Sequence, residues 1–274
     1  MTTVFKRMHH IVIGVKDLDA AAADWAKHFA TAGSNVLEQD GSRRVMFNGG
    51  ATGIALAQPT SESGPLWDFL ETKGQGIYAV ALQVDNVDTV AKQAETQGAN
   101  IGSANGASHV YIEPSSTSGV RLELWDEAPE LEGSPIFARF HHLVVATTGT
   151  KAAAEKWHRF FDIHGKGTGK SMIPAAPEGK EYFGLVDAAD HPPPVKKFLD
   201  ERGEGVYALS VVADDVEATV RGVKERGGRV LGDENGRGQL WIHPITTHGV
   251  LLEVNDEAYS RSWEADYGKP PFNR

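Results

Sequence analysis

The segment FLETKGQGIYA (residues 69–79) returns 129 residues later (198 − 69) as FLDERGEGVYA (residues 198–208). Two further segments also recur: HHIV at 9–12 returns as HHLV at 141–144, and GVRLE at 119–123 returns as GVLLE at 249–253. The three offsets stay close, at 129 (198 − 69), 132 (141 − 9) and 130 (249 − 119). The chain is therefore an internal duplication with few insertions, and a residue kept or lost in both copies reflects the shared architecture.

Each copy has the pattern of a strand, a helix and further strands, followed by the same order again. Alternating β-rich residues at 9–15 predict a strand, and Asp17 is the expected N-cap of a helix with one apolar face. Strands expected at 43–48 and 53–57 are joined by the hairpin signal Gly49-Gly50. After a helical connector the order restarts, with expected helix starts at Asp85 and, in the second copy, at Asp214. The sequence thus predicts an α+β fold with four strand–helix–strands modules, two in each half.

The module boundaries suggest how the chain is divided into domains. We expect a first domain at residues 1–126, a linker at 127–138, a second domain at 139–256 and a C-terminal tail at 257–274. The linker is an acidic stretch that contains Pro129 and Pro135. The tail is polar and aromatic and is expected to pack as an irregular arm or to remain loose.

Composition excludes several classes of site and partner. Cysteine is absent, which rules out disulfides, cysteine nucleophiles and zinc–thiolate sites within this chain. The net charge of −10 and the scattered basic residues argue against nucleic acid and membranes as partners. The first residues carry no apolar signal core, and no apolar run approaches the length of a membrane span. We therefore expect a cytoplasmic protein with a small-molecule substrate or ligand, and a homodimer if copies associate.

Three stretches of the first half carry a resemblance to a known family. They are HIVIGVKDLD (residues 10–19), FLETKGQGI (residues 69–77) and the stretch from Glu113-Pro114 to Glu123. The chain resembles the vicinal-oxygen-chelate superfamily, also called the glyoxalase/bleomycin-resistance/dioxygenase group, and each half is most similar to methylmalonyl-CoA epimerase. The resemblance covers about residues 8–126 and 140–256, the second half more loosely. It implies paired βαβββ modules that curl each half into a cup of mixed sheet with the helices outside.

The resemblance also implies a divalent metal (Mg, Mn, Co, Zn or Fe) held by four inward-facing residues. The implied ligands that this chain retains are one His and one Glu in each half: His10 and Glu123 in the first, His142 and Glu253 in the second. The other two ligand positions of the family fall at Ala55 and Ala79 in the first half, and at Gly184 and Ala208 in the second. Catalytic zinc normally has three protein ligands, and non-heme iron has two His and one carboxylate. Two ligands per half fall short of both, which places the metal mechanism of the family in doubt, whereas Mg²⁺ tolerates fewer protein ligands because it keeps several waters.

Four residues of the first half are candidates for catalysis. The epimerase uses two glutamates to remove a proton from the carbon next to a thioester carbonyl and to return it on the other face. The resemblance places these glutamates at Glu123 and near Glu38. The second half has Gly167 or Thr168 in place of Glu38, so the first half is the better candidate. Arg121 precedes Glu123 by two residues and shares its strand face, where it could bind a carboxylate or neutralise Glu123. Tyr78 replaces a family His and could act as an acid or an oxyanion donor.

Less specific interpretations remain open for the same residues. Glu123 could be an ordinary strand carboxylate paired with Arg121, and Glu38 lies in a polar stretch typical of a solvated turn. His10 and His142 could be core histidines, and Tyr78 could be a packing aromatic.

Three functions fit these patterns. The first is an enzyme that abstracts a proton from a small carbonyl or carboxylate compound: an epimerase, isomerase or lyase. The second is a protein that sequesters a small molecule, as in the bleomycin-resistance branch, because binding needs only a shaped apolar cup. The third is an extradiol-type dioxygenase, which matches the four-module layout but lacks the second His.

Overall fold

The computed structural model describes residues 4–103, 109–127, 130–162, 172–175, 181–189, 193–232 and 240–267. The first half contains β1 (Phe5–Gly14), α1 (Leu18–Phe29), β2 (Leu37–Gln39), β3 (Ser42–Phe47), β4 (Gly53–Pro59), α2 (Pro65–Lys73), β5 (Gly76–Val84), α3 (Val87–Thr96), β6 (Ile101–Ser103), β7 (His109–Ile112) and β8 (Arg121–Trp125). The second half contains β9 (Arg139–Ala146), α4 (Thr150–Phe161), β10 (Met172–Pro174), β11 (Tyr182–Val186), α5 (Pro194–Arg202), β12 (Gly205–Val212), α6 (Val216–Glu225), β13 (Val230–Leu231), β14 (Leu240–Ile242), β15 (Leu251–Asn255) and α7 (Glu257–Tyr267).

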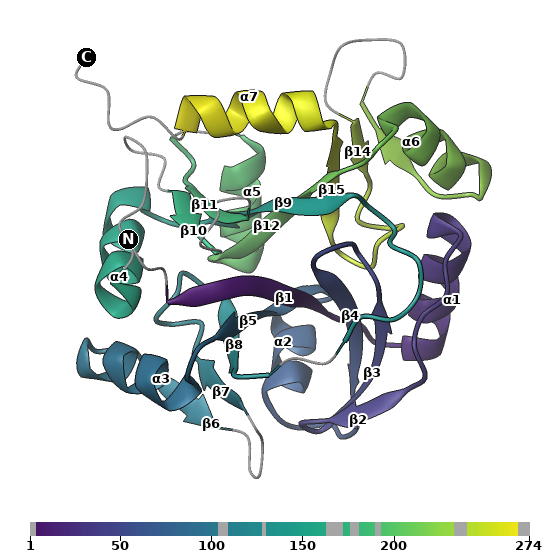
Figure 1. Cartoon of the computed structure of the whole chain (residues 1–274). Coiled ribbons are helices and arrows are strands. Elements are labelled where there is room, and N and C mark those ends of the chain that lie inside the picture. The colour runs from purple at the N-terminus through teal and green to yellow at the C-terminus, as the bar shows by residue number, and fades with distance from the viewer. Residues whose placement is uncertain are drawn as a thin grey trace.

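Each half builds one mixed sheet. The first has the strand order β2-β3-β4-β1-β5-β8-β7-β6, and the second has β10-β11-β9-β12-β15-β14-β13. In both sheets the central pair is antiparallel (β1 with β5, β9 with β12), and each central strand has a parallel partner outside it. The predicted α+β fold of duplicated, curled halves is confirmed (Figure 1).

Helix starts follow local hydrogen bonding. Asp17 caps α1 as predicted, since its carboxylate accepts from the Ala20 N–H at 3.0 Å. The starts predicted at Asp85 and Asp214 were wrong by one residue, because the caps are the following residues, Asn86 and Asp215. Asp85 instead forms a surface ion pair with Lys6.

The two halves share one hydrophobic core. Helices α3 and α4 pack together on one side of the molecule, and α1 and α6 pack together on the other, with β1 and β9 between them (Figure 1). Phe5 of the first half packs against Phe161 of the second, with ring centroids 4.9 Å apart and the ring planes tilted by 57°. Trp25 of α1 and Trp157 of α4 are fully buried in this core. Burial of this shared surface is the main stabilising contribution.

The connector helices α2 and α5 lie apart from the shared core. Leu66 and Leu70 of α2 pack on a cluster that includes Val12, Ala55 and Ala79 of the first sheet. Val195 of α5 packs in the same way on the second sheet. The face of each sheet turned away from the shared core is therefore partly covered by its own connector helix, and is called the inner face below.

We propose residues 127–138 as the linker between the halves, because this segment is bonded to both. The Ile136 N–H donates to the Asn48 carbonyl, and the Ala138 N–H donates to the Val212 carbonyl, each at 2.9 Å. Beyond the second half, the expectation of an irregular tail is wrong for residues 257–267, which form α7. Asp256 accepts from the Tyr259 N–H at 2.6 Å, and Arg139 pairs with Glu257 at 3.1 Å, so the helix is capped and anchored. Among the described residues, no helix is long and apolar enough to span a membrane.

Candidate functional site

His10 and Glu123 lie in one row across the inner face of the first sheet. His10 of β1 is in register with Ala81 of β5, which is in register with Glu123 of β8. Side chains in register on neighbouring strands point to the same face. His10 Nε2 lies 3.9 Å from Glu123 Oε2, and the carboxylate is fully buried. His10 and Glu123, the two metal-ligand residues that the family resemblance implies for the first half, therefore lie close together.

Glu123 is paired with Arg44, a residue that was not predicted. From β3, the guanidinium Nη2 lies 3.4 Å from Glu123 Oε1, and Nη1 lies 3.5 Å from Oε2. Arg44 is 3% exposed, and its Nε donates to Ser42 Oγ at 3.0 Å. The signal was available in strand alternation, because Arg44 alternates with Val45 and must face the opposite side from that core residue.

Arg121 has a different partner from the one expected. Its Nη1 donates to Glu113 Oε2 at 3.0 Å, and its guanidinium carbon lies 4.0 Å from the Tyr111 ring centroid. The interpretation of Glu123 as a carboxylate paired with Arg121 is therefore corrected, since Arg44 reaches it across the curled sheet. Arg121 is buried and lies on the inner face with Glu123.

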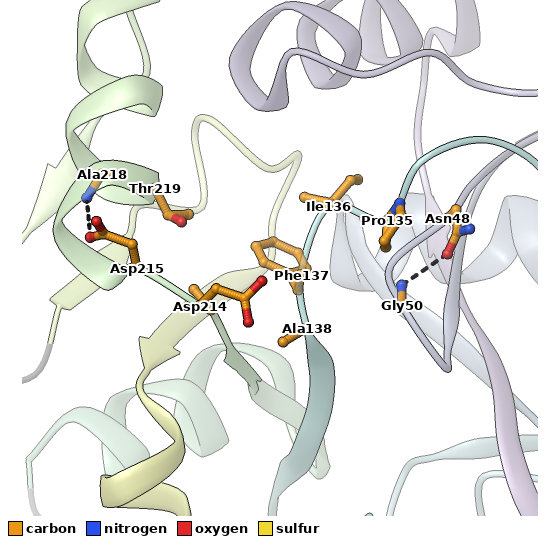
Figure 2. Close-up of a pocket in the computed structure, with 11 residues that line it drawn as sticks. Asn48, Gly50, Pro135, Ile136, Phe137, Ala138, Asp214, Asp215, Ala218 and Thr219 are labelled. Carbon is orange, nitrogen blue, oxygen red and sulfur yellow. Dashed lines mark hydrogen bonds between the residues drawn. The ribbon is translucent and has the colours of Figure 1, made fainter.

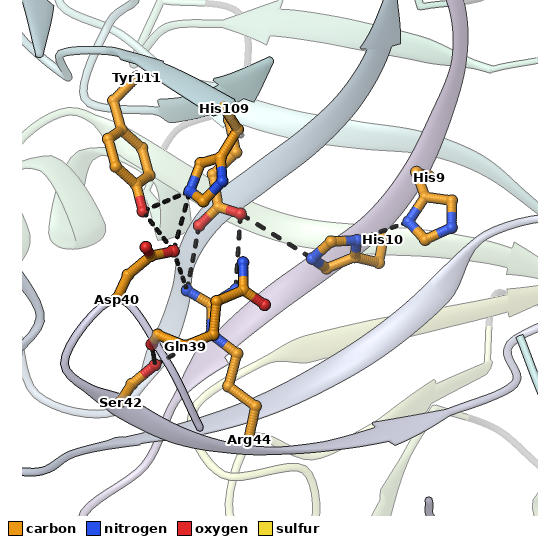
Figure 3. A network of polar contacts seen from close by, with 9 residues as sticks. His9, His10, Gln39, Asp40, Ser42, Arg44, His109 and Tyr111 are labelled. Atoms are coloured by element: carbon orange, nitrogen blue, oxygen red, sulfur yellow. Dashed lines mark hydrogen bonds and ion pairs between the residues drawn. The ribbon is translucent and has the colours of Figure 1, made fainter. Parts of the chain in front are cut away.

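A second polar cluster joins the two ends of the curled sheet. Asp40 lies in the turn between β2 and β3, and its Oδ2 is 2.8 Å from His109 Nε2 and accepts from the Tyr111 hydroxyl at 2.9 Å (Figure 3). His109 and Tyr111 belong to β7, near the opposite edge of the sheet. Burial raises the pKa of Asp40, but the hydrogen bonds from His109 and Tyr111 outweigh this effect and lower it to about 2. These three residues, called the clasp, hold the hairpin against β7.

The histidine pairs of both halves are buried. His9 Nδ1 lies 2.7 Å from His10 Nδ1, and His141 Nδ1 lies 3.0 Å from His142 Nδ1. Burial lowers the pKa of His10 well below its ordinary value, and the neighbouring His9 lowers it further. Burial has the same effect on the pKa of His142. Both rings are therefore neutral near pH 7, so one nitrogen of each ring can accept a proton or hydrogen bond.

Tyr78 lies beside this arrangement on β5. Its ring contacts Phe69 of α2, with centroids 5.4 Å apart, and the Arg121 guanidinium carbon lies 5.6 Å from its centroid. Burial raises the pKa of Tyr78 to about 12, with Arg121 opposing the shift and Glu123 adding to it. The phenol stays protonated near neutral pH and can donate a hydrogen bond.

Glu38 lies outside this arrangement. It is in register with Arg43 on the β2–β3 hairpin and is exposed. Because alternate residues point to opposite faces, Glu38 and Arg43 face away from the side that carries Arg44. Its role as a base stays a prediction.

The linker also reaches the first-half site. A Cβ placed on Gly53 would lie 2.5 Å from Leu131 Cδ2 and 3.3 Å from His10 Cβ. Leu131 therefore covers Gly53 directly beside His10. Sequence reasoning assigned this residue to a linker and gave it no part in the site.

The second half repeats the row with different chemistry. His142 and Glu253 are each in register with Ser210, which stands where the first half has Ala81. Burial raises the pKa of Glu253, and hydrogen bonds with Ser210 and Asn255 oppose this shift. Leu251 replaces Arg121, so the two inner faces do not present the same groups.

The residues of the first half do not fit the divalent metal that the family implies. Ala55 and Ala79 stand at two of the four ligand positions and pack in the apolar cluster under α2. Glu123, one of the two retained ligands, is paired with the Arg44 guanidinium. The described parts of the chain contain no group of three or more His, Cys, Asp or Glu residues that could hold a metal ion.

A separate hollow of about 520 Å³ lies at the linker. Figure 2 shows it between the β3–β4 turn, residues 135–138 and the start of α6. None of its lining residues belongs to the His10–Glu123 row or to the clasp. It is therefore distinct from the candidate site.

The comparisons with known proteins agree with this architecture. Residues 9–112 match the model of the Glyoxalase/Bleomycin resistance protein/Dioxygenase superfamily. The ethylmalonyl-CoA/methylmalonyl-CoA epimerase of Cereibacter sphaeroides is 30% identical over 128 residues, which cover 43% of this chain and 96% of the epimerase. The 4-hydroxyphenylpyruvate dioxygenase of Pseudomonas aeruginosa is 26% identical over 223 residues, 70% of this chain, and the match spans 62% of the dioxygenase's length.

Solved structures share the arrangement of both halves. A mutant of 4-hydroxymandelate synthase from Streptomyces coelicolor superposes with a TM-score of 0.71 at 17% identity, covering 91% of this chain and 92% of that one. At this identity the likeness concerns the fold alone.

Proposed function

Because the chain belongs to the glyoxalase/bleomycin resistance protein/dioxygenase superfamily, we propose that it is an enzyme that abstracts a proton beside a carbonyl in a small carbonyl or carboxylate compound. The observation that carries this proposal is the fully buried Glu123 carboxylate, flanked on the inner face of the first sheet by His10 and Arg44. We assign the site to the first half.

Each group of the site has a proposed role. Glu123 is the base, since a positioned carboxylate can accept a carbon-bound proton from a substrate held beside it. Arg121 binds a carboxylate or phosphate group of the substrate, because guanidinium forks match such anions. Tyr78 donates a hydrogen bond to the oxygen on which charge develops.

The position of Glu38 bears on the reaction type. Epimerisation with two bases needs a second carboxylate on the other side of the reacting carbon, and Glu38 faces away from Arg44 and the inner face. We therefore favour an isomerase that returns the proton to a different atom of the substrate through one base, or a lyase in which a leaving group departs, over an epimerase. A cytoplasmic location and homodimer formation belong to the same proposal and rest on the cysteine-free, acidic composition and on the family.

Deuterium exchange tests the role of Glu123. Candidate carboxylates and thioesters are incubated with the full chain in D₂O, and incorporation at the carbon beside the carbonyl is followed by NMR. We expect Glu123→Gln to slow exchange by about 10²–10⁴-fold, the usual contribution of a positioned base. The matched control is Glu253→Gln, the same change at the equivalent position of the second half, which should leave exchange unchanged. Equal rates for wild type and Glu123→Gln would overturn the proposal.

A ligand-sequestering protein is the second candidate function. The observation that favours it is the apolar cluster at the lost ligand positions, since Ala55 and Ala79 pack with α2 and offer no polar group. Tight binding of an apolar small molecule that is recovered chemically unchanged would support this function. Dioxygenase chemistry ranks third, because iron oxygenases use two His and one carboxylate and the first-half row supplies one of each.

A further inference from the structure

In the first half, the retained ligand residue Glu123 is paired with a guanidinium instead of completing a metal site with His10. The Glu123 carboxylate lies 3.9 Å from His10 through Oε2, and both of its oxygens face the Arg44 guanidinium at 3.4 and 3.5 Å. We propose that Arg44 is the permanent positive charge of this site and takes the place of the metal ion, so that the site binds the carboxylate group of a small molecule without a metal. This inference rests on the proposed function and adds Arg44 to Arg121 as a group that binds the substrate carboxylate.

Charge and position make Arg44 and a divalent cation mutually exclusive. A guanidinium stays protonated at all ordinary pH values, so Arg44 cannot become neutral to admit a second cation. A divalent ion bound to Glu123 would share its carboxylate with this charge inside a buried site, where like charges are poorly screened. The missing ligands agree, because Ala55 and Ala79 offer no donor to stabilise such an ion.

The Arg44–Glu123 pair is loose enough to admit a further anion. Its nitrogen–oxygen distances of 3.4 and 3.5 Å exceed the roughly 2.7–2.9 Å of a tight charge-assisted hydrogen bond. Among the described residues, Ser42 takes the Nε–H and Glu123 takes one N–H from each Nη. The remaining two of the five N–H groups make no hydrogen bond to a described residue, although Nη2 also forms an ion pair with Asp40 Oδ2 at 3.8 Å.

Buried nitrogen atoms nearby also lack partners. Within the described part of the chain, four fully buried side-chain nitrogens around the first-half cluster have no hydrogen-bond partner: Gln39 Nε2, His109 Nδ1, Arg121 Nε and Trp125 Nε1. His109 is stacked on Trp125 at 4.3 Å, and Arg121 lies over Tyr111. Gln39 Nε2, Arg121 Nε and Trp125 Nε1 are N–H donors, whereas His109 Nδ1 is an acceptor when Nε2 carries the proton donated to Asp40. An unsatisfied buried donor costs about 1–3 kcal/mol, and oxygen atoms of a bound ligand would accept from such donors. These atoms point to an oxygen-rich ligand.

Oxalate is a suitable probe, because it is small and presents carboxylate oxygens. Its binding to the full chain is measured by isothermal titration calorimetry before and after dialysis against EDTA, and MnCl₂ is titrated separately. We expect wild type to bind oxalate equally well after EDTA treatment and to show no Mn²⁺ binding that depends on Glu123. Arg44→Met should weaken oxalate binding by about tenfold or more, which corresponds to about 1.4 kcal/mol.

Two further variants keep the result interpretable. Arg43→Met is the matched control, since Arg43 is the neighbouring arginine, faces away from the side of β3 that carries Arg44 and pairs with Asp19. This variant should bind oxalate like wild type. If Arg44→Met fails to fold, Arg44→Lys retains the charge but not the fork and should weaken binding measurably. The proposal is overturned if EDTA abolishes oxalate binding and Mn²⁺ restores it, if both Arg44 variants bind like wild type, or if wild type binds no oxalate at millimolar concentration. If the wild-type protein binds oxalate but catalyses deuterium exchange in none of the candidate compounds, the proposed reaction is refuted and this inference stands.

Discussion

Glu123 and Arg44 form an ion pair that is removed from water on both sides, with exposed fractions of 0% and 3%. Desolvating two charges is costly, and the mutual attraction offsets this cost only while both partners are present. Ser42 and His10 add polar contacts to the pair. The intact pair therefore adds little to the net stability of the fold, whereas removal of either partner alone should be strongly destabilising.

A double-mutant cycle tests this dependence. We expect Arg44→Met to lower the free energy of unfolding by about 3–5 kcal/mol, because it leaves a buried carboxylate uncompensated. The double variant Arg44→Met/Glu123→Leu should recover most of this loss, since both charges are then absent. Urea denaturation of the single and double variants measures the coupling. Additive losses would show that the two side chains do not interact in solution.

The clasp acts between elements, because it joins the β2–β3 turn to β7 across the opening of the curled sheet. Asp40 has φ +50° and is followed by Gly41 with φ +69°, the left-handed pair typical of a two-residue hairpin turn. This turn directs the Asp40 carboxylate onto His109 and Tyr111. Local turn chemistry thus determines how far the sheet closes.

Asp40 makes this closure dependent on pH. Its pKa is about 2 in the folded chain against an ordinary 3.8, so the unfolded chain binds more protons between these values. The stabilisation is fully present above about pH 4 and is lost as the pH falls through 2; its size is about 2 kcal/mol. Asp40→Asn keeps the turn preference and removes the charge, so it should lose about this amount at pH 7 and about half of it near pH 3, as judged by urea midpoints. A constant difference at both pH values would contradict the assignment.

Element order could be predicted from the sequence, whereas the contacts between distant strands could not. Periodicity and caps located α1, the β3–β4 hairpin and the restart at β5, because these signals are local. Arg44 and Asp40 were missed because their partners lie on β8 and β7, and nothing local encodes how strongly a sheet curls. Glu38 was named as a base from the resemblance alone, and the way it faces depends on how β2 pairs with β3, which the sequence does not show.

At the scale of the whole molecule, the two halves meet through reciprocal contacts that follow the duplication. Arg202 of the second half donates to the Gln75 carbonyl at 2.9 Å, and Lys73 of the first half donates to the Glu204 carbonyl at 2.8 Å. Gly119 and Gly249, equivalent residues of the two copies, approach the same connectors closely. A Cβ on Gly119 would lie 2.0 Å from the Glu204 carbonyl oxygen, and one on Gly249 would lie 2.1 Å from that of Gln75.

These glycines should therefore be essential to the docking of the halves. Gly119→Ala forces the Glu204 backbone to move and also places an alanine at φ +79°, so we expect a loss of about 2–4 kcal/mol in the free energy of unfolding. Gly41→Ala is the matched control, because Gly41 has a similar φ of +69° but no atom within 4 Å of the added Cβ. The Gly41→Ala variant suffers only the strain of an alanine at positive φ and should lose about 1 kcal/mol in the free energy of unfolding. Equal urea midpoints for the two variants would mean that the close approach at Gly119 is absent in solution, and that the halves are not held together through the equivalent positions of the repeat.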